Sequence, residues 1–110
     1  MPGFRELTVK ALLKKLEDTK IPRYMHHTLA YYIAEGKPTG HFLTAVLTND
    51  LKEACNRADD DNKDRLYDYV FFLYNNAPSA CWGSPENVAE WRKETAVKQE
   101  IAAAAAAEGS

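Results

Sequence analysis

The chain has 110 residues and a formal net charge of −2, with 45% hydrophobic and 27% charged residues and five each of glycine and proline. This balance is typical of one globular domain, and it excludes a turn-rich β-sandwich and a disordered linker. A domain that binds duplex DNA usually carries a marked basic excess, which is missing here, so DNA binding is the least favoured function.

Charge is placed unevenly along the chain. Residues 1–23 carry six basic and three acidic side chains, whereas residues 50–68 carry seven acidic and four basic ones. The first interpretation is two solvated helix faces. The second is head-to-tail or self-complementary association guided by the opposite patches.

Two helices are predicted in the first third of the chain. Apolar residues recur at helical spacing after Thr8, which predicts a helix with Thr8 as its N-cap. Pro22 suits the first turn of a second helix, because that turn needs no N–H from this residue. This helix is expected to run to about Glu35, since Gly36 favours the left-handed conformation that ends helices.

Residues 41–58 are predicted to form one or two helices. The apolar spacing is continuous, but Thr48, Asn49 and Asp50 prefer helix caps to helix interiors. We expect one helix to end at Thr48 and a second to begin with Asn49 as its N-cap. One long helix remains the alternative.

The acidic run Asp59–Asn62 predicts the start of the most hydrophobic helix of the chain, over residues 60–75. Apolar and aromatic residues extend around more than one side of this helix, so it is central or contacts another subunit with its second face. Ser84 and Pro85 then predict a last helix. Beyond Trp91 its apolar pattern fades into six consecutive alanines, which favour helix but give a core little to bury.

These elements predict an all-α fold, a compact bundle of about five short helices with an alanine-rich helical extension. Residues 1–91 are expected to form the single domain, and residues 92–110 an exposed helical or frayed tail. No stretch approaches the ~20 apolar residues of a membrane span, and no secretory signal is recognised. We therefore expect a cytoplasmic protein with reduced cysteines.

The sequence gives little support to catalysis or metal binding. His26 and His27 are adjacent and diverge by about 100° on a helix, so they do not readily face one metal. The acidic run lacks the glycine and the final glutamate of a calcium loop. Cys81, in a loop, is the more reactive-looking thiol, whereas Cys55 lies on an apolar stripe. We expect no catalytic residues, no metal and no cofactor, with an enzyme that lacks a recognisable motif as the open alternative.

A ligand site is predicted from polar and aromatic side chains that lie mostly outside the main apolar stripes. Arg57 would neutralise phosphate, the amide and carboxylate at 49 and 50 would contact polar edges, and aromatic rings would stack. The structural alternatives are helix caps at 49 and 50 and a core plug at Trp82, and the same composition is typical of a protein interface. The candidate ligand-binding residues are Tyr24, His27, Asn49, Asp50, Arg57 and Trp82.

Two stretches resemble a group of small uncharacterised proteins encoded by tailed bacteriophages and prophages. The first is Pro38–Leu51, with the pattern TG-x-FL-x-AVL-x-NDL, and the second is Trp82–Glu86, with the sequence WGSPE. The resemblance covers about residues 21–91. It implies a small phage accessory protein made in the bacterial cytoplasm, a class whose members often bind and neutralise a host factor.

The leading hypothesis is a non-enzymatic counter-defence protein that sequesters a small anionic, nucleotide-like signalling molecule. It would act as a homo-oligomer assembled through the aromatic second face of the helix over residues 60–75. The first alternative is a protein-binding inhibitor of a host defence enzyme, which would use the same aromatic surface. The second is a DNA-associated accessory or regulatory protein that uses the basic segment 5–23.

Overall fold

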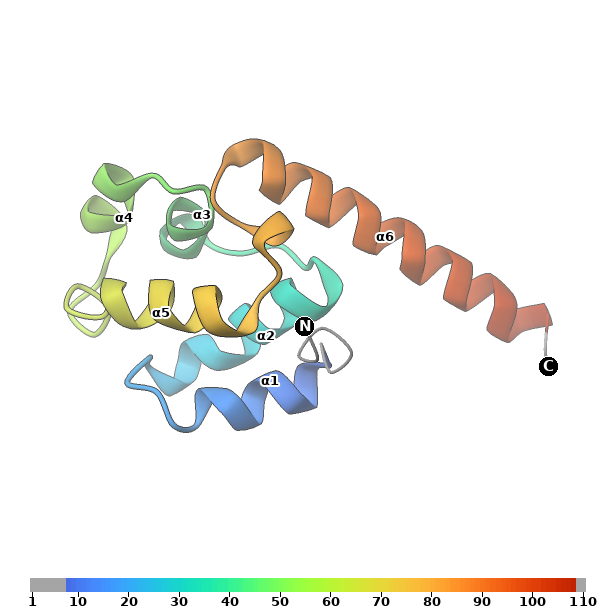
Figure 1. Ribbon diagram of the computed structural model, residues 1–110, viewed down its shortest axis with the longest axis horizontal. Helices are drawn as coiled ribbons and strands as arrows, with labels where there is room; N and C mark the ends of the chain where they lie inside the picture. Colours follow the sequence, from blue (N-terminus) through green and yellow to red (C-terminus); the bar gives the residue numbers. More distant parts are fainter. Residues whose placement is uncertain (1–7, 109–110) are drawn as a thin grey trace.

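The computed structural model describes residues 8–108, with side chains to residue 105. These residues form helices and no strand, which confirms the predicted all-α class. Figure 1 shows short helices gathered into one body, from which the last helix extends as an arm. The elements are α1 (Val9–Leu16), the 3-10 turn η2 (Arg23–Met25), α2 (His26–Glu35), α3 (His41–Leu47), α4 (Leu51–Arg57), α5 (Leu66–Asn76), the 3-10 turn η3 (Ser79–Cys81) and α6 (Pro85–Glu108).

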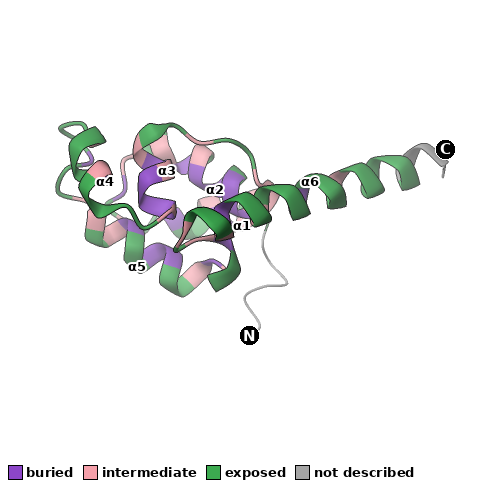
Figure 2. Cartoon of the chain, turned by 90° about the horizontal axis from the view of Figure 1, so that it is seen from above, coloured by how far each residue is buried: buried purple, intermediate pink, exposed green. Residues whose placement is uncertain are grey.

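Apolar side chains from the short helices meet in one core, seen as the buried interior in Figure 2. α1 packs along α2, α3 packs against α4, and α6 crosses α2. The Tyr32 hydroxyl lies in this core and donates to the Cys81 carbonyl at 2.6 Å, so its burial leaves no unpaired donor. The largest fully buried side chains are Leu12, Leu16, Leu29, Tyr32, Ile33, Leu43, Leu47, Tyr69, Phe72, Leu73 and Cys81.

The predicted start of α1 and the predicted end of α2 are confirmed. Thr8 Oγ1 accepts a hydrogen bond from the backbone N–H of Ala11 at 3.1 Å, as an N-cap does. Gly36 follows α2 with φ +66°, in the left-handed region that glycine adopts without strain. A single 3-10 turn after Pro22 precedes the regular part of α2.

The helix break at residues 48–50 is also confirmed, but the predicted cap is wrong. Asn49 has φ +63° and ends the first helix instead of starting the second. Asp50 is the N-cap of α4, because its Oδ1 accepts from the backbone N–H of Glu53 at 3.1 Å. Asparagine tolerates the left-handed conformation, which explains the exchange of roles between these two neighbours.

The acidic run does not begin α5, contrary to the prediction. Asp59 instead caps a turn of its own, with Oδ1 accepting from the backbone N–H groups of Asp61 at 3.1 Å and Asn62 at 2.9 Å. α5 begins later, at Leu66, after Arg65, which makes no side-chain cap. The Asp59 carboxylate therefore stabilises the loop between α4 and α5.

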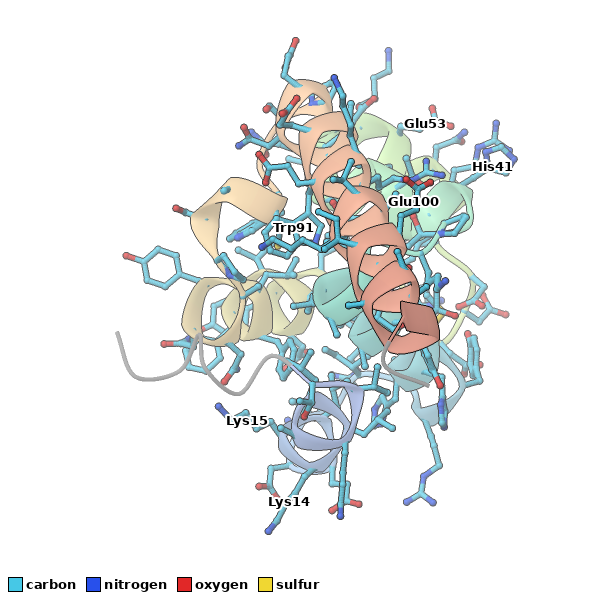
Figure 3. The ribbon with its side chains drawn as sticks, turned by 90° about the vertical axis from the view of Figure 1, so that its right-hand side faces the viewer. Lys14, Lys15, His41, Glu53, Trp91 and Glu100 are labelled. Atoms are coloured by element: carbon cyan, nitrogen blue, oxygen red, sulfur yellow. The ribbon has the colours of Figure 1, made fainter. Side chains whose placement is uncertain are left out.

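α6 is one uninterrupted helix, so the predicted boundary at residue 91 lies inside it. Trp91 lies between this arm and the body in Figure 3, and its Nε1 donates to the Tyr32 carbonyl at 3.2 Å. Thr95 is buried, and Gln99 Nε2 lies 3.3 Å from Glu35 Oε1. The packed part of α6 thus reaches Gln99, and residues 109 and 110 of the predicted tail lie outside the described residues.

None of the described helices combines the length and the apolar character that crossing a membrane requires.

Candidate functional site

The predicted ligand-binding residues are divided among separate places on the surface. Tyr24 and Arg57 line one cleft. Asn49 and Asp50 border a smaller hollow between α4 and α5, and His27 borders a third hollow beside α1. Tyr24 and Arg57 therefore share one cleft, the sequence neighbours Asn49 and Asp50 share another hollow, and His27 borders neither of these two.

Trp82, the sixth predicted residue, lies in the segment between η3 and α6. It is half-buried and packs against the hydrophobic core. Its carbonyl accepts from Asn87 Nδ2 at 2.9 Å, and the next residue, Gly83, donates its N–H to the Leu47 carbonyl at 2.7 Å. This placement matches the alternative in which Trp82 plugs the core.

The cleft beside Tyr24, which we call the Tyr24 cleft, has a volume of about 380 Å³. It lies between the start of α2, the start of α3 and the loop after α4. Its volume falls in the usual range of small-molecule sites, roughly 300–1,000 Å³. Its lining includes Tyr24, His41, Phe42, Arg57, Asp59 and Asn62.

A chain of hydrogen bonds connects the Tyr24 cleft with the core. The Tyr24 hydroxyl donates to Asp59 Oδ2 at 2.5 Å and accepts from Asn62 Nδ2 at 3.2 Å. On the inner side, the buried Tyr69 hydroxyl of α5 donates to Asn62 Oδ1 at 2.5 Å. Asn62 therefore bonds the hydroxyl groups of both tyrosines and fixes the loop against η2 and α5.

The same hydrogen bonds set the protonation of the cleft. The bond to Asp59 raises the pKa of Tyr24 to about 12, with a further contribution from the nearby carboxylate charges. That bond also lowers the pKa of the Asp59 carboxyl below its ordinary value, and backbone N–H donors add to the effect. At neutral pH Asp59 is therefore ionised and Tyr24 is neutral.

The charge of the Tyr24 cleft does not favour the predicted anionic ligand. Arg57 Nε lies 2.6 Å from Glu53 Oε1, so the guanidinium already has a carboxylate partner. The second carboxylate, Asp59, lines the cleft itself, and Asp60 and Asp61 follow in the chain. A ligand that offers hydrogen-bond donors fits this balance better than a phosphate does.

The shifted pKa of Asp59 predicts a stability change in acid. A folded-state pKa below the unfolded value stabilises the protein above the unfolded pKa of about 4, and this stabilisation is lost as the pH falls through the folded value. Urea unfolding is expected to show a decrease in the free energy of unfolding from about pH 5 to about pH 3. The decrease should be smaller in Tyr24→Phe, because the largest cause of the shift is removed.

Tyr31→Phe is the matched control for that experiment. Tyr31 is also an exposed tyrosine, on α2, and it does not line the cleft that contains Asp59. Its variant should keep the wild-type pH dependence. If Tyr24→Phe and Tyr31→Phe titrate alike, the hydroxyl of Tyr24 does not depress the pKa of Asp59.

A second surface lies on α5 and includes none of the six predicted ligand-binding residues. We define the α5 face as Tyr67, Val70, Phe71 and Tyr74, whose exposed fractions are 74%, 45%, 57% and 79%. Their spacing of i, i+3, i+4 and i+7 places them on one side of the helix. The rings of Tyr67 and Phe71 are stacked, with centroids 5.8 Å apart, so they form a continuous aromatic ridge.

The α5 face continues towards α4. Val70 also lines the hollow between α4 and α5, which has a volume of about 60 Å³. Leu51, Ala54 and Leu66 contribute apolar walls to this hollow, and Leu51 itself is exposed. The sequence signal for this surface was the apolar character of the helix on more than one side.

The two thiols are placed opposite to expectation. Cys81, the predicted reactive thiol, is buried, and burial raises its pKa to about 12, so it stays protonated at neutral pH. Cys55 is exposed on α4. The predicted order of reactivity was wrong because the loop that contains Cys81 is folded into the core.

The basic segment proposed for DNA contact lies mainly on α1. Lys14 and Lys15 point away from the body in Figure 3, at the other end of the molecule from Glu53. The start of this segment, residues 5–7, lies outside the described residues. The end of the basic segment lies near the acidic loop, however, because Arg23 is next to Tyr24, whose hydroxyl donates to Asp59.

Comparison of the chain with protein-family models, curated proteins and solved structures gives no match. Within residues 8–108, no three or more His, Cys, Asp or Glu side chains are grouped so that they could hold a metal ion. The function is therefore inferred from the surfaces of this chain.

Proposed function

We propose that this protein is a non-enzymatic binding protein that works through its α5 face, by contact with another polypeptide. The observation that carries the proposal is the exposure of Tyr67, Phe71 and Tyr74 along one side of a single helix. Contiguous exposed apolar surface is characteristic of interaction sites. Aromatic residues are enriched at interfaces, and tyrosine is prominent among the residues that dominate binding energies.

The fold itself does not require these aromatic side chains. α5 packs into the core with its opposite side, through Tyr69, Phe72 and Leu73, which are fully buried. Covering an exposed large apolar side chain contributes roughly 1.5–3 kcal/mol when the burial is complete. The α5 face therefore offers binding energy to a partner while contributing little to the stability of the isolated chain.

The resemblance to small phage proteins supplies a setting for this proposal. In that setting the protein acts in the cytoplasm of an infected bacterium, where an assembly built through the α5 face sequesters a host factor. That factor is a defence protein or a signalling molecule. The contact at α5 is the part of this hypothesis that the geometry supports best.

Photo-crosslinking tests the proposal. A photoreactive amino acid at Phe71 is expected to give a discrete covalent product with a polypeptide in bacterial cells that produce the chain. The matched control is Ile101 on α6, an apolar residue of similar exposure, 63% against 57%. Lack of a discrete product at Phe71, or the same products at both positions, would contradict the proposal.

The Tyr24 cleft supports a second candidate function, the binding of a small molecule. The specific observation is that Tyr24 and Arg57 line one cleft of suitable volume, with an exposed ring for stacking and Asp59 as an acceptor. A nucleoside-like ligand would stack on Tyr24 and present amino or hydroxyl groups to Asp59. A phosphate on such a ligand would contact Arg57, which Glu53 already pairs.

Native mass spectrometry with nucleosides and with cyclic and linear nucleotides tests this candidate. If a phosphate contacts Arg57, Arg57→Glu should abolish nucleotide binding and leave the fold intact, because the side chain is half-exposed. Retained affinity in this variant would remove Arg57 from the site. Lack of any bound mass on the wild-type protein would count against the cleft as a nucleotide site and leave the α5 proposal unaffected.

A further inference from the structure

The geometry points to a second copy of this chain as the polypeptide that covers the α5 face. The two α5 helices would lie antiparallel across a two-fold axis that passes between Val70 and Phe71. This inference rests on the proposed function, because it names the partner of the same surface.

The α5 face has the symmetry that such an arrangement needs. In sequence order it is Tyr67, Val70, Phe71 and Tyr74, so a tyrosine stands three residues outside each member of a central pair. Turning the helix end over end therefore exchanges the position of Tyr67 with that of Tyr74, and the position of Val70 with that of Phe71. In an isologous contact residue i of one copy meets residue j of the other and j meets i, so Tyr67 of each copy meets Tyr74 of the other.

The charges of α5 itself do not oppose this pairing, and the charged residue that borders the neighbouring hollow is Asp50. A two-fold axis brings each group near the axis close to its own copy, and like charges there would repel. Among the eleven residues of α5, Asp68 is the one charged side chain. It is next to the α5 face in the sequence, and its carboxylate forms an ion pair with Arg65 at 3.7 Å. Antiparallel helices also place opposite ends of the two helix dipoles next to each other.

The surface also combines a ridge with a hollow. Tyr67 and Phe71 form the ridge, and the hollow between α4 and α5 lies on the other side of Val70, next to the exposed Leu51. In an antiparallel two-fold pair each lateral side of the face meets the same side of the other copy, so the ridge meets the ridge and the hollow meets the hollow. The two aromatic ridges would therefore pack against each other across the axis.

The exposed area sets the expected strength. Aromatic side chains bury about 150–250 Å² each, so the partly exposed rings, with Val70 and Leu51, amount to roughly 400–600 Å². A stable standard interface uses about 800 Å² on each partner. We therefore expect a reversible dimer with a dissociation constant roughly in the micromolar range.

Sedimentation velocity over a concentration series tests the dimer. The wild-type chain should shift from monomer to dimer as its concentration rises from about 1 μM to about 1 mM. Val70→Asp places two carboxylates near the axis and should weaken the dimer by at least tenfold. Val97→Asp on α6 is the matched control, because Val97 is a valine of nearly equal exposure, 47% against 45%, and it should leave the dimer unchanged.

Directed disulfide formation tests the antiparallel register without relying on a destabilised variant. With the exposed Cys55 replaced by serine, equal amounts of Tyr67→Cys and Tyr74→Cys chains are mixed and oxidised with oxidised glutathione. The mixed disulfide between the two different chains should form several-fold faster than either symmetric disulfide. Preferred formation of the symmetric disulfides would indicate a parallel or different contact and would overturn the inference.

The outcomes separate this inference from the proposed function. A wild-type chain that stays monomeric to about 1 mM, while Phe71 still crosslinks to one different protein, overturns the dimer and retains the α5 face as a binding surface. A monomeric chain that gives no discrete crosslink overturns both. A dimer that survives Val70→Asp assembles through another surface, which also overturns the inference.

Discussion

Gly36→Ala is expected to lower the free energy of unfolding by about 3 kcal/mol or more. The residue has φ +66°, and a left-handed conformation costs a non-glycine residue roughly 1–2 kcal/mol. An added Cβ would also lie 1.8 Å from Thr95 Oγ1 and 3.2 Å from the Cα of Arg92. Because the second of these atoms is backbone, α6 must move away from α2 to make room.

Urea unfolding measures this loss, and two variants separate its causes. Gly83→Ala introduces a side chain at φ +105° with only Asn87 Nδ2 nearby, at 3.9 Å, so it reports the backbone cost alone. Thr95→Ala combined with Gly36→Ala removes the closest contact and should recover part of the stability. If Gly36→Ala costs no more than Gly83→Ala, α6 does not pack against α2 at this position.

The second large effect is expected at Asn62, whose side chain is 2% exposed. Asn62→Ala should lower the free energy of unfolding by about 3 kcal/mol, because it removes several hydrogen bonds and leaves the buried Tyr69 hydroxyl without its acceptor. It also removes one of the two hydrogen bonds that join the loop after α4 to Tyr24, and the bond from Tyr24 to Asp59 is left alone. The Tyr24 cleft is then expected to lose its shape.

A double-mutant cycle with Tyr69→Phe checks that explanation. Tyr69→Phe removes the donor of this hydrogen bond. In that background, Asn62→Ala should therefore lower the free energy of unfolding by about 1 kcal/mol or more less than it does in the wild-type protein. Asn75→Ala is the control, since Asn75 is an exposed asparagine at the end of α5. Strict additivity of the Asn62 and Tyr69 changes would show that the hydrogen bond between them contributes nothing measurable.

The sequence predicted those parts of the fold that depend on local patterns. Thr8, Gly36 and the break near residue 49 act through their own backbone and their near neighbours, so residue preferences were sufficient to place them. The exchange between Asn49 and Asp50 shows the limit of that approach. Both residues cap helices, and the choice between them depends on which one occupies the left-handed conformation.

Long-range contacts could not be predicted in the same way. The tyrosine that Asp59 binds lies 35 residues earlier in the chain, so no local pattern indicates this contact. From its neighbours alone, Asp59 is predicted to be a helix cap. Thr95 and Gln99 lie in a segment with no apolar periodicity, yet they contact the end of α2. Their packing follows from the close approach that Gly36 permits, which no pattern within α6 indicates.

The candidate site shows the same difference between local patterns and long-range contacts. Tyr24 and Arg57 were selected for their chemistry, and the fold brings them to one cleft, whereas Trp82 packs against the core and Asp50 caps α4. The excess of aromatic residues in its helix indicated that α5 has a second apolar face. Which of those residues are exposed depends on the side from which α3 packs against α5, and this required the structure.

Hydroxyl-radical footprinting of tyrosines, read by peptide mass spectrometry, tests the role of the α5 face most directly. Tyr67 and Tyr74 belong to the face, while Tyr24 and Tyr31 are exposed tyrosines outside it and serve as internal controls. At about 1 mM protein, modification of Tyr67 and Tyr74 should fall several-fold relative to the controls and recover on dilution to about 1 μM. Equal modification of all four tyrosines at both concentrations would contradict coverage of the α5 face by a second copy.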